Sequence, residues 1–160
     1  MQKLEILYQN VRGLRTRVQQ FYTNTLLNRY DIIAVTETWL HQGICNGELF
    51  EQNYVVFRKD RNETDSGATR GGGLILAVDK KVLAERYSAI ELQDVCVEQI
   101  WIRVQVRKNS WLYIGLFYFP PGTDRGNMHK SMIKSLLMAS AMRTFYSWEI
   151  LICHYSIFKI

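Results

Sequence analysis

The feature of this sequence that most constrains its fold is the short apolar run Asp31-Ile-Ile-Ala-Val35, which is followed closely by Glu37. The run is rich in β-branched residues and does not alternate with polar ones, a pattern typical of a strand covered on both faces. Ligands of open α/β sheets gather at the carboxyl ends of such strands. Glu37 is therefore a candidate site residue, although a glutamate after a strand is more often a solvated loop residue.

A second strand is predicted upstream, from Leu4 to Tyr8 and ending at Asn10. Between the two strands, apolar residues recur at helical spacing from Leu14 to Asn28, which predicts an amphipathic helix. Strand, helix and strand form a βαβ unit, and its right-handed crossover makes the two strands parallel. Asn10 and Glu37 should therefore meet at the same edge of the sheet.

Three later segments have the composition of strands and lie close together in the sequence: Tyr87–Leu92, Val97–Val106 and Trp111–Phe119. Because a short polar turn separates the last two, the pattern favours an antiparallel meander. Its polar members are compatible with one wetter face: Glu98, Arg103, Gln105 and Arg107.

The other predicted elements give an α/β fold with a mixed sheet in two layers, the second of them short of strands. They are a loop or short helix from His41 to Glu51, strands at Tyr54–Phe57, Leu74–Val78 and Ile150–Cys153, and a helix from Met128 to about Phe145.

Composition predicts one globular domain over residues 1–160, since 48% of the residues are hydrophobic and 22% are charged. Neither a membrane-spanning run nor a signal peptide is visible, so we expect an intracellular protein. The three cysteines are far apart and form no Cys-x-x-Cys pair, which argues against disulfides and zinc and favours core thiols. They are Cys45, Cys96 and Cys153.

The formal charge of +5 and the pI near 9.2 favour an anionic partner. Basic residues gather in three places: Arg12, Arg15 and Arg17; Arg58, Lys59 and Arg61; and Arg103, Arg107 and Lys108. If these groups share a surface, a phosphate backbone is their natural ligand. The run Arg70-Gly-Gly-Gly73 is either a flexible turn or a place of close approach, and it lacks the pattern of a nucleotide-binding P-loop.

Five motifs occur in order along the chain: Gln9-Asn10, Thr36-Glu37-Thr-Trp-Leu40, Arg58-Lys-Asp-Arg61, Arg70-Gly-Gly-Gly73 and Tyr118-Phe-Pro-Pro-Gly122. In this order they resemble the endonuclease/exonuclease/phosphatase superfamily. More narrowly, they resemble the apurinic-endonuclease-like domain of non-LTR retrotransposons, which lies ahead of a reverse transcriptase. The resemblance implies a two-sheet β-sandwich flanked by helices, which nicks DNA at one edge for target-primed reverse transcription.

The resemblance also implies roles for individual residues. Glu37 would hold Mg²⁺ or Mn²⁺, Asn10 would order the metal and phosphate site, and Tyr118 would form a hydrogen bond near the scissile phosphate. These residue types suit the chemistry, because Mg²⁺ prefers hard oxygen ligands and is held by one or two carboxylates plus substrate phosphate. The residues expected to face DNA are Arg58, Lys59, Arg61 and Arg70. A nuclear location is implied by the resemblance alone.

The sequence departs from the family after Ile150–Cys153, where the family has Gly-Asp-x-Asn. Here the residues are His154-Tyr155-Ser156-Ile157, and no Gly-Asp-x-Asn occurs elsewhere. A histidine base needs an orienting partner, and none is visible in the sequence beside His41, His129 or His154.

The sequence thus favours a truncated or decayed endonuclease domain, which is inactive and has an incomplete second sheet, an unpaired strand edge and an exposed apolar face. Two alternatives are a non-catalytic nucleic-acid-binding remnant and a phosphatase-like member of the same superfamily.

Overall fold

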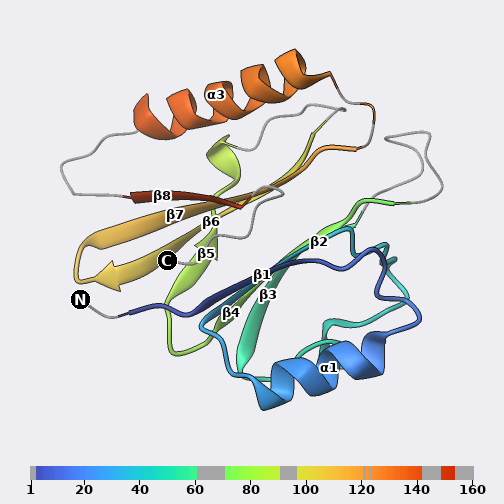
Figure 1. The fold of residues 1–160 in the computed structure, drawn as a ribbon. Coiled ribbons are helices and arrows are strands. Elements are labelled where there is room, and N and C mark those ends of the chain that lie inside the picture. Colours follow the sequence, from blue (N-terminus) through green and yellow to red (C-terminus); the bar gives the residue numbers. More distant parts are fainter. Residues whose placement is uncertain are drawn as a thin grey trace.

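The structure is a computed structural model and describes residues 3–60, 71–90, 97–120, 122, 124–141 and 149–153. In these residues two four-stranded sheets pack face to face, and a helix lies on the outer side of each sheet (Figure 1). This arrangement is the two-sheet sandwich flanked by helices that the sequence predicts, so the predicted α/β two-sheet fold is confirmed. The expectation that the second layer has fewer strands is not met in the described residues, where each sheet has four strands.

The first sheet, sheet A, contains the βαβ unit. Its strand order is β1-β2-β4-β3, with β1 (Ile6–Asn10), β2 (Ile32–Thr36), β3 (Tyr54–Lys59) and β4 (Leu74–Asp79). The strands β1 and β2 are parallel, and Asn10 lies opposite Thr36. Helix α1 (Val18–Leu27) makes the crossover. It begins later than the predicted Leu14, because Leu14 N donates to Thr38 O at 2.9 Å and so pairs with the loop after β2.

The second sheet, sheet B, has the order β5-β6-β7-β8, with β5 (Ala84–Arg86), β6 (Glu98–Arg107), β7 (Ser110–Tyr118) and β8 (Glu149–Cys153). Strands β5 to β7 are antiparallel, as predicted, and β8 is parallel to β7. The strand predicted at Tyr87–Leu92 is wrong. Pairing with β6 ends where Tyr87 N donates to Trp101 O at 2.8 Å, and η2 (Ser88–Ile90) then forms a 3₁₀ turn.

Helix α3 (Arg125–Ala141) covers the outer face of sheet B. It begins before the predicted Met128, because Asp124 satisfies two of its first backbone donors. The side chain of Asp124 accepts a hydrogen bond from Asn127 N at 3.0 Å, and its carbonyl accepts one from Met128 N at 3.0 Å. The predicted end near Phe145 lies outside the described residues. A 3₁₀ helix, η1 (Asn46–Glu48), lies in the segment expected to be a loop or short helix.

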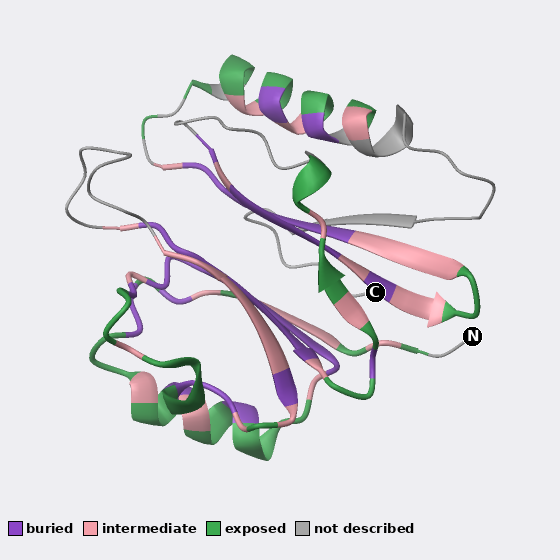
Figure 2. Ribbon diagram, turned by 180° about the vertical axis from the view of Figure 1, so that it is seen from behind, coloured by how far each residue is buried: buried purple, intermediate pink, exposed green. Residues whose placement is uncertain are grey.

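The apolar run in β2 is explained by packing on both faces. Ile32 and Ala34 belong to the core between the sheets, whereas Ile33 and Val35 belong to the core on the α1 side. Figure 2 shows buried residues concentrated in the strands that face each other. The prediction that Cys45 is a core thiol is wrong, because Cys45 is exposed. The other two cysteine side chains lie outside the described residues. In the described part of the chain, no helix is both long and apolar enough to cross a membrane.

Candidate functional site

The two site residues predicted to converge do so. Asn10 ends β1 and Glu37 follows β2 directly, and Asn10 Nδ2 donates a hydrogen bond to Glu37 Oε1 at 2.9 Å. The amide of Asn10 is oriented from its other end, since Arg12 N donates to Asn10 Oδ1 at 3.3 Å. Only 8% of Glu37 is exposed. A nearly buried carboxylate thus sits at the carboxyl ends of two parallel strands, with one of its oxygens held by an amide.

The backbone around Glu37 is strained and tightly held. Glu37 has φ of 57° and Trp39 has φ of 53°, in a left-handed region that non-glycine residues seldom adopt. Such conformations persist when the surroundings hold them in place, and they cluster at functional sites. On one side, Gly13 N donates to Glu37 O at 2.7 Å; on the other, Thr38 N donates to Gly73 O at 3.2 Å. The loop is therefore fixed from both neighbouring strands.

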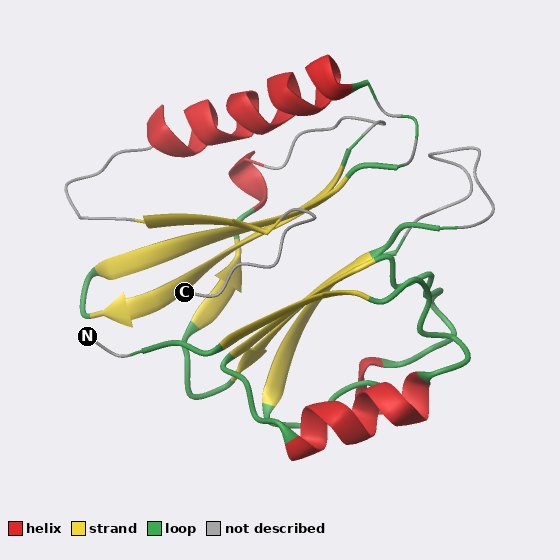
Figure 3. Cartoon of the chain, in the orientation of Figure 1, coloured by secondary structure: helices red, strands yellow, loops and turns green. Residues whose placement is uncertain are grey.

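The glycine run before β4 is a place of close approach and not merely a turn. Gly71, Gly72 and Gly73 all have positive φ, and a Cβ on Gly73 would overlap Thr38 Oγ1. Thr38 is completely buried, and its hydroxyl has no hydrogen-bond partner in the described part of the chain. Figure 3 shows the loops after β1 and β2 and the segment entering β4 at the same end of sheet A. The glycines let these three segments pack together.

Three arginines follow Asn10 in the loop that leads to α1: Arg12, Arg15 and Arg17, all exposed. Arg15 Nε donates to Trp39 O, and Arg17 Nη2 donates to Val11 O at 3.1 Å. Each guanidinium carries five N–H donors, so these backbone contacts use only part of its capacity. The arginines place positive charge in the loop that follows Asn10.

Tyr118 lies at the carboxyl end of β7 and is only 4% exposed. Its side chain packs in the core between the sheets, and its register partner is Glu98, the first residue of β6. Glu98 Oε2 accepts a hydrogen bond from Gly73 N at 2.6 Å. The structure therefore connects Tyr118 to the Glu37 loop through Glu98 and Gly73.

The prediction that Glu98 shares a wetter face with Arg103 is wrong. Alternate residues of a strand point to opposite faces, and these two residues are five positions apart. Glu98 lies on the inner face with Ile100, whereas Arg103 lies on the outer face, with its guanidinium over the rings of Tyr87 and Trp111. The odd spacing of five positions between Glu98 and Arg103 was the sequence signal that could have placed Glu98 on the inner face, toward the site.

The predicted DNA-facing residues at the end of β3 differ in their surroundings. Arg58 makes hydrogen bonds of 2.6 Å to Ile44 O and 2.7 Å to His41 O and an ion pair of 2.5 Å with Asp60, and its side chain is 12% exposed. Its guanidinium therefore holds the loop after β2. Lys59 is half-buried and lies opposite Leu74, which lies opposite Thr36. Lys59 thus shares one end of sheet A with Asn10, three strand spacings or about 14 Å away. Arg61 and Arg70 lie outside the described residues.

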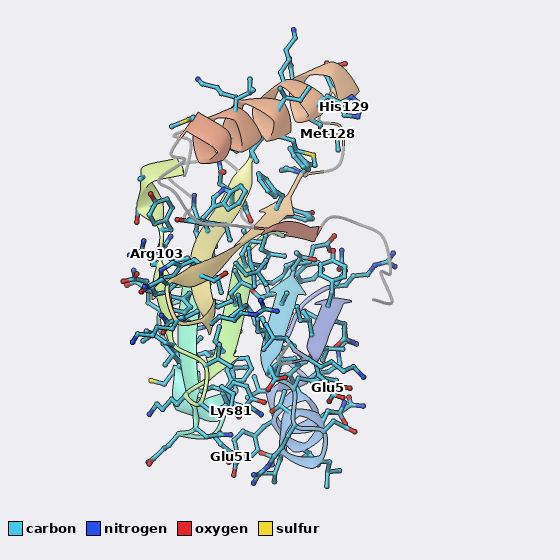
Figure 4. The ribbon with its side chains drawn as sticks, turned by 90° about the vertical axis from the view of Figure 1, so that its left-hand side faces the viewer. Glu5, Glu51, Lys81, Arg103, Met128 and His129 are labelled. Carbon is cyan, nitrogen blue, oxygen red and sulfur yellow. The ribbon has the colours of Figure 1, made fainter. Side chains whose placement is uncertain are left out.

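The described histidines lie apart from this site. His129 lies on α3 (Figure 4) and is exposed, and His41 is exposed in the loop after β2, where its Nδ1 accepts a hydrogen bond from Gly43 N at 3.1 Å. Both are surface residues. His154 lies outside the described residues.

The residues around Glu37 fit a divalent cation of the Mg²⁺ type. Among the described residues, no three His, Cys, Asp or Glu side chains are grouped closely enough to form a metal cage. Mg²⁺ does not require such a cage, because it commonly uses one or two carboxylates and completes its shell with water and phosphate. Glu37 offers one oxygen held by Asn10, and within the described residues its other oxygen accepts no hydrogen bond. That second oxygen is suited to a hard cation.

No protein-family model matches the sequence, and no curated protein matches it. Solved structures do match. The endonuclease domain of TRAS1, a telomere-specific non-LTR retrotransposon, is 11% identical, with a TM-score of 0.58 over 82% of this chain and 52% of that chain. An AP endonuclease from Archaeoglobus fulgidus is 18% identical, with a TM-score of 0.57 over 91% of this chain and 56% of that one.

A third match is ANGEL2, a 2',3'-cyclic phosphatase, which is 12% identical, with a TM-score of 0.57 over 94% of this chain and 51% of that one. This chain therefore spans about half the length of the structures it matches. At these identities the similarity defines the fold. The chain has the fold of the endonuclease/exonuclease/phosphatase superfamily, and the resemblance predicted from its five motifs is confirmed at that level.

Proposed function

We propose that this chain is the metal-binding part of a DNA-nicking endonuclease domain of the non-LTR retrotransposon type, and that these 160 residues do not cleave DNA by themselves. The observation that carries the proposal is the hydrogen bond of 2.9 Å between Asn10 and the nearly buried Glu37. A carboxylate held by an amide, in a strained loop at the strand ends, is costly to keep without a ligand. The matching TRAS1 domain, an endonuclease domain of a non-LTR retrotransposon, supports the same function.

Glu37 would hold the cation, with Asn10 fixing the orientation of its carboxylate. When bound, Mg²⁺ or Mn²⁺ supplies Lewis acidity toward a phosphoryl oxygen. The arginines of the loop after β1 and Lys59 at the end of β3 would attract and position the phosphate backbone of DNA. Tyr118 would contribute a hydrogen bond close to the scissile phosphate.

We assign no residue of this chain as the general base that would activate the attacking water. The sequence contains no Gly-Asp-x-Asn motif, and His41 and His129 are exposed; the described hydrogen bond of the His41 side chain is to Gly43 N. A general base must lie within hydrogen-bond reach of the proton it removes. We therefore expect metal and DNA binding without turnover.

The first experiment is calorimetric titration of Mg²⁺ and Mn²⁺ into the full chain and into Glu37→Gln. Glutamine keeps the size of the side chain and removes its charge. Glu51→Gln is the matched control, because Glu51 is a partly exposed glutamate in the loop before β3. Saturable binding that is lost only in Glu37→Gln supports the proposal. Absence of saturable binding in the unmodified chain refutes the metal site.

The second experiment tests cleavage. Supercoiled plasmid is incubated with the chain and Mg²⁺, with Glu37→Gln as the blank. We expect no nicking above the blank. Robust nicking that disappears in Glu37→Gln would show that the 160 residues are a working nuclease.

Two other functions have an observation in their favour. The three exposed arginines of the loop after β1 suit a module that binds nucleic acid without cutting it. In that case DNA affinity would fall steeply with salt and would be unchanged in Glu37→Gln. The match to a 2',3'-cyclic phosphatase favours a phosphatase-like activity on a small substrate. Hydrolysis of the cyclic phosphate of a 2',3'-cyclic nucleotide by water, and not plasmid nicking, would identify that function.

A further inference from the structure

Glu98 is the one carboxylate of sheet B that makes a described hydrogen bond to the segment beside Glu37. It is the first residue of β6, and its side chain lies on the inner face of the sandwich, toward sheet A. Glu98 Oε2 accepts a hydrogen bond of 2.6 Å from Gly73 N. A bond between a charged carboxylate and a backbone N–H is roughly twice as strong as a neutral one. Glu98 therefore fixes the Gly73 amide from the opposite sheet.

The amide that Glu98 holds belongs to a rigid unit that also touches the Glu37 loop. Gly73 N–H and the Gly72 carbonyl are the two polar groups of one peptide bond, which is planar. Gly72 O accepts a hydrogen bond from Trp39 N at 3.0 Å. Since the N–H and the carbonyl of a trans peptide point in opposite directions, Glu98 on one side and Trp39 on the other fix the same plane.

This peptide plane would rotate easily without an external hold. Glycine populates positive and negative φ about equally, and Gly72 and Gly73 have φ of 68° and 88°. The next carbonyl, Gly73 O, accepts the bond from Thr38 N at 3.2 Å. Rotation of the glycine segment would therefore release both Thr38 and Trp39, the two residues that follow Glu37.

We propose that Glu98 is a positioning residue, which holds the peptide between Gly72 and Gly73 and through it keeps the Glu37 loop in its metal-binding conformation. The effect on metal affinity rests on the proposed function above. The effect on the loop does not, because it concerns only the hydrogen bonds of Thr38 and Trp39. The effect on the loop is measured by amide hydrogen exchange, and the effect on metal affinity is measured by calorimetry.

The experiment compares Glu98→Ala with Glu98→Gln in the full chain. Alanine removes the acceptor for Gly73 N, whereas glutamine retains a carbonyl oxygen at the same distance along the side chain. Amide hydrogen exchange is measured at Thr38 and Trp39 by NMR, relative to the amide of Val35 in the buried strand β2. Mn²⁺ affinity is measured by calorimetry. Glu85→Ala is the control, since Glu85 also lies on sheet B but pairs with Arg103 on the outer face.

In Glu98→Ala we expect the exchange of Thr38 and Trp39 relative to Val35 to rise about tenfold or more, and Mn²⁺ affinity to fall by a similar factor. Glu98→Gln should restore both to within about threefold of the unmodified chain, and Glu85→Ala should change neither. Rescue by glutamine distinguishes positioning through a hydrogen bond from a direct effect of the Glu98 charge.

Unchanged exchange at Thr38 and Trp39 in Glu98→Ala would overturn the proposal, and so would a Glu98→Gln variant that behaves like alanine in both assays. If Glu98→Ala does not fold, Glu98→Asp carries the test, because its shorter side chain should lose the bond to Gly73 N and raise exchange in the same way. If the unmodified chain binds no Mn²⁺, the proposed metal site fails, while hydrogen exchange still decides whether Glu98 holds the loop.

Discussion

Replacing Gly73 with alanine should lower the free energy of unfolding by about 2–5 kcal/mol, as the sum of two effects. The φ of Gly73 is 88°, and the left-handed region costs an L-residue about 1–2 kcal/mol. The new Cβ would also overlap Thr38 Oγ1, and overpacking of this kind costs about 1–3 kcal/mol. Urea unfolding, followed by circular dichroism and analysed by linear extrapolation, measures the loss.

Two variants separate these effects. Gly122 has φ of 89° but open space where a Cβ would be, so Gly122→Ala should show the backbone cost alone, about 1–2 kcal/mol. Thr38→Ala removes the hydroxyl and leaves Trp39 N at 3.5 Å as the nearest atom to the new Cβ of residue 73. In that background, Gly73→Ala should cost no more than Gly122→Ala. If Gly73→Ala costs no more than Gly122→Ala with Thr38 present, close approach is not the reason for glycine at this position.

Two further predictions concern charged residues of sheet A. Arg58→Ala should lower the free energy of unfolding by about 2–3 kcal/mol, because two backbone carbonyls of the loop after β2 lose a charged donor. The control Lys59→Ala should change the free energy of unfolding by about 0.5 kcal/mol or less. Equal losses for the two variants in urea unfolding would contradict the structural role of Arg58. Burial opposes ionisation of Asp31, but hydrogen bonds from Lys81 and from Glu5 N–H outweigh it and lower the pKa of Asp31 in the folded chain. The resulting stabilisation is present above the pKa of an unfolded aspartate and is lost as the pH falls below about 4 through the pKa of the folded state. Asp31→Asn should therefore flatten the pH dependence of the free energy of unfolding in that range, measured by urea unfolding. Identical pH dependence in the variant and the unmodified chain would refute this role of Asp31.

The sequence predicted the βαβ unit and the meeting of Asn10 with Glu37 because both follow from local patterns and one connection rule. Apolar periodicity marks α1, the unbroken apolar run marks β2, and a right-handed crossover makes β1 and β2 parallel. The hydrogen bond between Asn10 and Glu37 then requires only that both residues lie at the strand ends.

The interactions that the sequence did not predict join residues that are distant along the chain. The charge of Arg58 placed it among the residues expected to face DNA. Its ion pair with Asp60 is local, but its hydrogen bonds to the carbonyls of residues 41 and 44 are not revealed by any charge pattern. Glu98 contacts Gly73 across the two sheets, and predicting that contact requires knowing which face of β6 packs on sheet A. The short strand β5 was misplaced because its extent is set by pairing with β6 and not by its own composition.

The hydrogen bonds that hold the Glu37 loop are mostly main-chain bonds, to Gly13 N on one side and to Gly72 O and Gly73 O on the other. Such bonds do not depend on the identity of the flanking side chains, so neighbouring residues can drift while the shape of the loop is retained. The fold as a whole is likewise shared at low identity, with TM-scores of 0.57 to 0.58 at identities of 11% to 18%. The shape of the loop and the identity of the side chains around it can therefore change independently of one another.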